Sequence, residues 1–247
     1  MKSLAGPTDR LLVVTAHPDD EITMAGTLAL AARAGARVTE LCLTRGEASR
    51  AAVLDGEVGA ERIGPARLAT ARERELRSSA GALGIADVRI GSWPDGRLTV
   101  SAPELADVVE AALTDVDATV VISLDDVIGL YGHPDHVASG AAARVAVDRT
   151  RAAGRSLRWY QATLPRWQVV VARRLSPVFR RAVTEAAGGP PVPTVYVPIV
   201  PAARQKLAAV RAHDSQRAVL GDVQPLFGTI PDGLYYHVFS REYFTAI

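Results

Sequence analysis

The sequence has little cysteine, little net charge and no long apolar segment. Its 247 residues include one cysteine, and 28 Lys and Arg balance 27 Asp and Glu. One cysteine excludes an intrachain disulfide, and a buried free thiol at Cys42 fits a reducing compartment. The charge balance indicates neither a nucleic acid nor a membrane surface as partner. Because no signal-peptide core and no run of transmembrane length is present, we expect a soluble, cytoplasmic protein.

A Gly-x-Gly-x-x-Gly phosphate loop is also absent, and a different set of side chains stands where such a loop would lie. Residues 11–14 (Leu-Leu-Val-Val) predict a buried strand. Residues 16–21 follow as Ala-His-Pro-Asp-Asp-Glu, which is one imidazole and three carboxylates, and Glu21 opens a predicted helix. In an open α/β sheet, the turn after such a strand is where ligands bind.

A second motif repeats this arrangement. The β-branched residues 119–122 predict another buried strand, and residues 133–136 (His-Pro-Asp-His) precede a helical stretch. In a helical turn, side chains three residues apart can converge, and imidazoles and carboxylates without a thiol suit Zn²⁺ or a related divalent ion. Helix capping is the alternative, because acidic residues and proline are common in a first helical turn. Two His-Pro-Asp motifs after two buried strands favour a metal.

Together the two motifs resemble those of the PIG-L/LmbE-like zinc-dependent N-acetylglucosaminyl deacetylases. The similarity runs from about residue 10 to about residue 244 and includes shorter segments at residues 44–47, 72–76, 94–96, 206 and 213–216. It implies a bacterial hydrolase that removes the N-acetyl group from a small-molecule amino sugar, either an N-acetylglucosaminyl-type glycoside or a conjugate. It also implies one Zn²⁺ per chain, with Fe²⁺ or Co²⁺ as alternatives, and allows a homo-oligomer.

The resemblance assigns roles that the spacing leaves open, because spacing alone does not decide whether Asp19 or Asp20 binds the metal. It makes His17, Asp20 and His136 the metal ligands and Asp19 the general base. The remaining assignments are His133 as a protonated partner for the developing charge or the leaving group, Tyr131 as a helper beside the oxyanion, and Asp135 as the residue that orients a histidine.

Three further residues are candidate substrate contacts: Arg45, Arg72 and Asp95. The resemblance places Arg72 and Asp95 at positions that contact sugar hydroxyls. The residues alone offer simpler interpretations, since Arg72 stands in a charged helical run and Asp95 in a Pro-Asp-Gly turn. His213 is expected to brace a helix rather than to bind metal, and His237 to be structural.

The alternation of strands and helices predicts an α/β fold, a Rossmann-like three-layer sandwich with a mostly parallel sheet and right-handed crossovers. The expected strands are residues 11–14, 38–43, 88–90, 119–122, 157–162, 167–172, 194–197 and 234–239. After the helix that Glu21 opens, the expected helices are residues 66–83, 103–113, 138–143, 173–187 (with Pro177 in its first turn) and 202–214. Residues 48–65 are expected to be a functional or disordered loop. We expect one domain over residues 1–247, with both motifs in a core sheet of about residues 1–150 and residues 151–247 completing the fold.

Two other functions remain open. The same metal could serve a phosphoesterase or another amidase, but phosphoryl chemistry favours an arginine or lysine clamp, and only Arg45 is placed for that. A catalytically silent sugar-binding module is the second alternative. It is disfavoured because binding alone does not need Asp19 as a base.

Overall fold

A seven-stranded sheet forms the centre of the computed structural model, which describes residues 3–176, 179–180, 189–224, 226–227 and 229–247. Its order is β5-β2-β1-β6-β7-β9-β8. The strands are β1 (Arg10–Thr15), β2 (Arg37–Thr44), β5 (Asp87–Trp93), β6 (Val120–Leu124), β7 (Arg158–Thr163), β8 (Val195–Pro198) and β9 (Arg241–Ala246). The first five are parallel, and β9 pairs antiparallel with β7 and β8. The predicted mostly parallel α/β fold is thereby confirmed.

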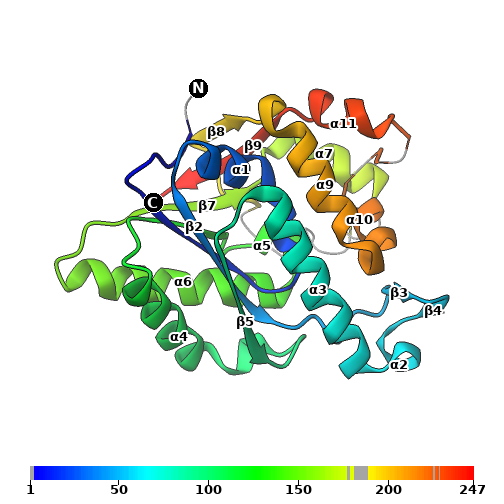
Figure 1. The fold of residues 1–247 in the computed structure, drawn as a ribbon, viewed down its shortest axis with the longest axis horizontal. Helices are drawn as coiled ribbons and strands as arrows, with labels where there is room; N and C mark the ends of the chain where they lie inside the picture. Colours follow the sequence, from blue (N-terminus) through cyan, green and yellow to red (C-terminus); the bar gives the residue numbers. More distant parts are fainter. Residues whose placement is uncertain (1–2, 177–178, 181–188, 225, 228) are drawn as a thin grey trace.

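Helices cover both faces of this sheet (Figure 1). Alternate β1 side chains belong to different cores: Leu11 and Val13 pack in one cluster, and Leu12 and Val14 in the other. The first core includes residues of α1 (Ala25–Arg33), α3 (Pro65–Leu83) and α9 (Ala203–Ala212), and the second includes residues of α4 (Ala102–Asp115) and α6 (Pro134–Ala152). Burial on both faces explains why β1 reads as a continuous apolar run.

Short elements make the connections. They are the helices α2 (Ala60–Ile63), α5 (Gly129–Gly132), α7 (Arg166–Leu175), α10 (Arg217–Val223) and α11 (Asp232–Val238), the 3₁₀ helices η1 (Asp20–Thr23), η2 (Leu98–Val100), η3 (Val200–Ala202) and η4 (Asp214–Gln216), and the hairpin strands β3 (Val53–Leu54) and β4 (Glu57–Val58). None of the helices described is long and apolar enough to cross a membrane. Cys42 is a buried free thiol, as expected.

The order of the strands determines where the two motifs meet. From β1 the chain goes to β2 on one side, whereas β6 lies on the other side of β1. This reversal opens a crevice at the carboxyl ends of β1 and β6, which is where open α/β sheets bind ligands. The first motif follows β1 and the second begins after β6, so both enter the same crevice.

Two predicted strands are wrong, because both segments are helical. Residues 167–172 lie in α7, and residues 234–239 overlap α11, while the closing strand is β9. Both are short runs rich in β-branched or aromatic residues, and periodicity does not separate a strand from a helix in such runs. In α11 the helix buries Tyr235 and Tyr236 and leaves Leu234 and Val238 exposed.

Two other expectations need amendment. The expected loop at residues 48–65 contains the β3–β4 hairpin and α2. Of the helix expected at residues 173–187, α7 includes residues 173–175 and residues 179–180 are helical, whereas Pro177 and residues 181–187 lie outside the described residues.

The close approach of α6 to the end of β6 can be tested at Gly140. A Cβ added there would lie 2.7 Å from the Leu124 carbonyl oxygen, whereas one added at Gly81 in α3 would meet open space. We therefore expect Gly140→Ala to lower the free energy of unfolding by about 1–3 kcal/mol through overpacking. Gly81→Ala should raise it by up to about 1 kcal/mol through helix propensity. Denaturant unfolding measures both, and equal stabilities for the two variants would contradict this packing.

Candidate metal centre and catalytic site

A carboxylate fixes the turn that follows β1. Asp20 Oδ2 accepts the backbone N–H groups of Ala16 at 3.0 Å and of His17 at 2.8 Å. The side chain of His17 is thereby directed into the crevice, where both His17 and Asp20 are buried.

Possible ligand atoms from three residues converge in this crevice. His17 Nδ1 lies 3.3 Å from His136 Nε2 and 3.6 Å from Asp20 Oδ2, and His136 Nε2 lies 3.0 Å from Asp20 Oδ1. Ligand atoms about 2.0–2.2 Å from a common tetrahedral ion lie roughly 3.4 Å from one another. The separations therefore fit one ion bound by two histidines and one carboxylate.

In both histidines the outer nitrogen, meaning the ring nitrogen that points away from the converging ligand atoms, faces an oxygen atom. His17 Nε2 lies 3.3 Å from Asp135 Oδ2 and 3.0 Å from Asp95 Oδ1, and His136 Nδ1 lies 3.1 Å from the Gly129 carbonyl oxygen. Each outer nitrogen is therefore placed to donate its N–H, and each inner nitrogen is left as an acceptor facing the Asp20 carboxylate. Acceptor atoms of three residues this close together require a cation between them. A histidine that binds a metal typically donates its other ring N–H to an oxygen atom, as both histidines do here.

The pKa values of Asp20 and His17 also indicate that this cluster favours a positive charge. Burial opposes ionisation, yet His136 and His17 hold the pKa of Asp20 well below its usual value. Burial also opposes protonation of His17, but Asp135, Asp20 and Asp95 raise its pKa well above the usual value. Without a metal, a proton on His17 can supply the missing cation.

A second triple of possible ligand atoms, from His17, His133 and His136, lies within 4.8 Å. We favour Asp20 over His133 as the third ligand, because His133 Nδ1 already accepts the N–H of Asp135 at 3.2 Å. A third triple consists of His17, Asp95 and Asp135. Its two carboxylates face the outer nitrogen of His17, where they orient the ring.

Asp19 is held beside this centre in an unusual backbone conformation, with φ at 115°. Its N–H donates to Glu21 Oε2 at 3.0 Å, and its carboxylate pairs with Arg72 Nη2 at 2.9 Å. Burial raises the pKa of Asp19 to about 6, against the opposing charge of Arg72. A carboxylate with such a pKa is mainly ionised at neutral pH and basic enough to accept a proton.

His133 and Tyr131 lie beside the two histidines of the centre. The His133 ring lies 4.8 Å from the His17 ring, and the Tyr131 ring lies 5.0 Å from the His136 ring, between centroids. Burial and the neighbouring histidines lower the pKa of His133 to about 4. Because Nδ1 of His133 accepts a hydrogen bond, its neutral ring carries the proton on Nε2. Burial raises the pKa of Tyr131 well above its usual value, so its hydroxyl stays protonated.

The three expected substrate contacts are engaged within the protein. Arg72 is 3% exposed, and its guanidinium donates to the carbonyl oxygens of Pro18 and Gly46 as well as pairing with Asp19. Asp95 accepts the Ala48 N–H at 2.8 Å and faces His17. Arg45 forms an ion pair with Glu73 away from the ligand atoms.

Sequence reasoning gave no role to Glu21 and did not identify its partner. Glu21 is fully buried and lies 2.6 Å from His213 Nε2, which follows the end of α9. His213 thus braces the first motif itself. The short similar segments contained a signal for such pairing, because Glu75 of one accepts the backbone N–H and the hydroxyl of Ser215 in another.

Comparison with known proteins identifies the family. The family model described as GlcNAc-PI de-N-acetylase, PIG-L, matches residues 12–147. The chain belongs to the PIG-L family. This membership confirms the resemblance found in the sequence and the expectation of an N-deacetylase.

Relatives match most of this PIG-L chain. A 1D-myo-inositol 2-acetamido-2-deoxy-alpha-D-glucopyranoside deacetylase from Kineococcus radiotolerans is 31% identical, covering 96% of this chain and 77% of that protein. A conserved protein from Thermus thermophilus has a structure with a TM-score of 0.65 at 26% identity, covering 96% of this chain and 94% of that one. The N,N'-diacetylchitobiose deacetylase from Pyrococcus horikoshii shares the fold, with a TM-score of 0.63 at 20% identity over 97% of this chain and 84% of that one.

Removal of either proposed histidine ligand should prevent metal binding. We expect the purified protein to contain about one divalent ion per chain and His17→Ala or His136→Ala to lose it, because two of three ligands hold an ion far less tightly. His237→Ala is the matched control, since His237 is an exposed histidine on α11. Elemental analysis after dialysis measures occupancy, and full occupancy in both ligand variants would exclude this ligand set.

Proposed function

We propose that the chain is a zinc-dependent N-deacetylase that hydrolyses the acetamide of an N-acetylglucosaminyl-type glycoside or conjugate. The observation that carries the proposal is the convergence of acceptor atoms from His17, Asp20 and His136, with the partly buried base Asp19 beside them. The donor atoms fit Zn²⁺ and also allow Fe²⁺ or Co²⁺. A relative that covers most of the chain and is named as a deacetylase of a 2-acetamido-glucopyranoside supports the substrate class.

Each residue has a role in amide hydrolysis. A bound ion would polarise the acetamide carbonyl and make a neighbouring water more acidic. Asp19 accepts the proton from that water and later returns it to the leaving amine. The neutral His133 donates a hydrogen bond from Nε2 to the developing oxyanion, with the Tyr131 hydroxyl as a second donor. This assigns His133 as a neutral donor instead of the protonated partner expected from the resemblance, because its pKa is about 4.

The geometry favours this chemistry over the two alternatives. A phosphoryl site needs a cationic clamp, but Arg45 is paired with Glu73 and Arg72 is buried against Asp19. A silent sugar-binding module would have no use for a base held at φ 115°, a conformation that is uncommon for residues other than glycine. A cytoplasmic location and a single domain over residues 1–247 are part of the proposal, and a homo-oligomer is compatible with it.

Asparagine variants separate the base from the ligand. Asp19→Asn should keep the metal and lose about 10²- to 10⁴-fold in kcat, the usual contribution of general acid–base catalysis. Asp20→Asn should instead weaken metal binding, because it removes the charged ligand. Steady-state kinetics with matched metal analysis distinguishes these results. If Asp19→Asn loses the metal and Asp20→Asn keeps it, the two roles are exchanged.

The contacts that Arg72 and Asp95 make within the protein change the expected effect of substituting them. Contacts to sugar hydroxyls would make Arg72→Gln and Asp95→Asn harmful only for sugar substrates. Since Arg72 holds Asp19 and Asp95 faces His17, we expect each variant to reduce kcat/KM by about tenfold or more, the equivalent of a charged hydrogen bond, on an N-acetyl sugar and on a minimal acetamide alike.

Arg45→Gln serves as the control, because it removes a guanidinium that contacts neither Asp19 nor His17. Its kcat/KM should stay within about threefold of that of the unmodified enzyme, since an exposed ion pair such as Arg45–Glu73 contributes little energy. Losses confined to the sugar substrate would restore Arg72 and Asp95 as sugar contacts.

A further inference from the structure

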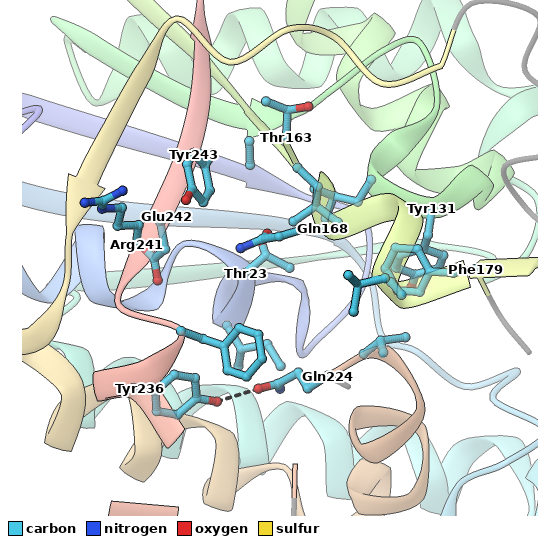
Figure 2. Close-up of a pocket in the computed structure, with 18 of the residues that line it drawn as sticks. Thr23, Tyr131, Thr163, Gln168, Phe179, Gln224, Tyr236, Arg241, Glu242 and Tyr243 are labelled. Carbon is cyan, nitrogen blue, oxygen red and sulfur yellow. Dashed lines mark hydrogen bonds between the residues drawn. The ribbon is translucent and has the colours of Figure 1, made fainter. Parts of the chain in front are cut away.

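A cavity of about 170 Å³ lies next to the catalytic site, and the proposed catalytic steps use Tyr131 at its edge but not the space itself. Its wall comes from α5, α7 and the C-terminal segments that include α10, α11 and β9 (Figure 2). The lining is mainly apolar and aromatic, and includes Leu130, Tyr131, Trp167, Val171, Phe179 and Tyr235. A mainly apolar pocket with a few polar groups is the usual form of a small-molecule site.

The cavity and the catalytic site share Tyr131. The Tyr131 ring lies 5.0 Å from the His136 ring and 5.7 Å from the Phe179 ring, between centroids. The η1 helix is shared as well, since Asp20 at its start belongs to the metal centre and Thr23 at its end lines the cavity. A group bound in the cavity would therefore be attached close to the reacting acetamide.

The charged side chains among the lining residues contact other groups of the chain. The Arg241 guanidinium lies over the Tyr196 ring, 4.9 Å from its centroid. Lys206 Nζ lies 2.6 Å from Glu242 Oε1, and Glu242 also accepts the backbone N–H groups of Gly26 and Thr27. Lys206 and Glu242 therefore do not need a charged ligand as a partner. Nε2 of Gln224 is a buried donor without a partner among the described residues, and a single oxygen on an otherwise apolar group would satisfy it.

Size and access limit the ligand further. An apolar cavity of about 150 Å³ accommodates a benzene molecule, so this one suits one aromatic ring or a chain of about six carbons. Trp167 is 56% exposed and Val171 is 40% exposed, which places both at the opening of the cavity on α7. An inositol, with its many hydroxyl groups, does not match such a lining.

We propose that this cavity binds an apolar substituent of the amino-sugar substrate, about the size of a phenyl ring or a six-carbon chain. The inference rests on the proposed deacetylase function for the rest of the substrate. Two positions on the sugar can carry such a group: the aglycone on C1, next to the acetamide on C2, or an N-acyl chain longer than acetyl.

Two pairs of substrates test the proposal and distinguish these positions. Phenyl and methyl N-acetylglucosaminides form the aglycone pair, and N-hexanoyl- and N-acetylglucosamine form the acyl pair. We expect kcat/KM to be about 30- to 70-fold higher for the larger member of one pair, because it buries roughly 100 Å² of additional apolar surface. The pair that shows the gain identifies the position. Equal kcat/KM values within both pairs would overturn the proposal.

Neighbouring valines on α7 provide matched variants. Val171 lines the cavity, whereas Val170 is similarly exposed and does not. Val171→Asp should remove the preference for the larger substrate without changing kcat/KM for its small partner, and Val170→Asp should change neither. Loss of the preference in both variants, or in neither, would contradict the assignment of the cavity.

Calorimetry separates this inference from the proposed function. Phenyl and methyl glucosaminides, the deacetylated products, are titrated into the unmodified enzyme and into Val171→Asp. Tighter binding of the phenyl glycoside that depends on Val171, with no hydrolysis of any N-acyl substrate, would support the cavity and overturn the deacetylase. Hydrolysis without preference, with equal binding of both products, would overturn the cavity alone.

Discussion

Three consecutive carboxylates that follow β1, two of them buried and the third partly buried, are the constraint on which the rest of the site depends. Asp19 pairs with Arg72 of α3, Asp20 faces His136 of α6, and Glu21 lies 2.6 Å from His213 after α9. A buried charge is costly unless it is paired and hydrogen-bonded. The turn after β1 therefore requires a cationic or protonated partner from three separate helical segments, and it holds those segments at one end of the sheet.

This triple pairing explains how Asp19 keeps its uncommon backbone conformation. A residue other than glycine at φ 115° persists only where its surroundings over-determine it. Here Glu21 accepts the Asp19 N–H while Arg72 holds the carboxylate and the Pro18 carbonyl oxygen. The direction of the proposed base is thus set by Glu21, two residues later in the chain, and by the buried Arg72, and it is fixed before substrate binds.

The local sequence pattern predicted the positions of strands and turns. It did not predict features that depend on tertiary packing. The run at residues 11–14 and the two His-Pro-Asp motifs located the two segments that carry the proposed metal ligands, because strand burial and turn position are local properties. The charged run around Arg72 looked solvated, since its burial depends on how α3 packs against the first motif. The pairing of Glu21 with His213 joins residues 192 apart, and no periodicity indicates it. In α11 the aromatic run imitated a strand, because a short apolar run looks alike in both elements.

The two functions of the site lie in different parts of the chain. The proposed ligands and base fall within residues 12–147, which match the family, whereas most of the cavity wall comes from residues 162–243. Substitutions in the later segment can therefore alter the apolar wall without displacing a ligand. Tyr131 and η1 are the points at which a change in the wall reaches the reacting groups. A fold divided in this way can keep one hydrolytic centre while the substituent that its substrate carries changes.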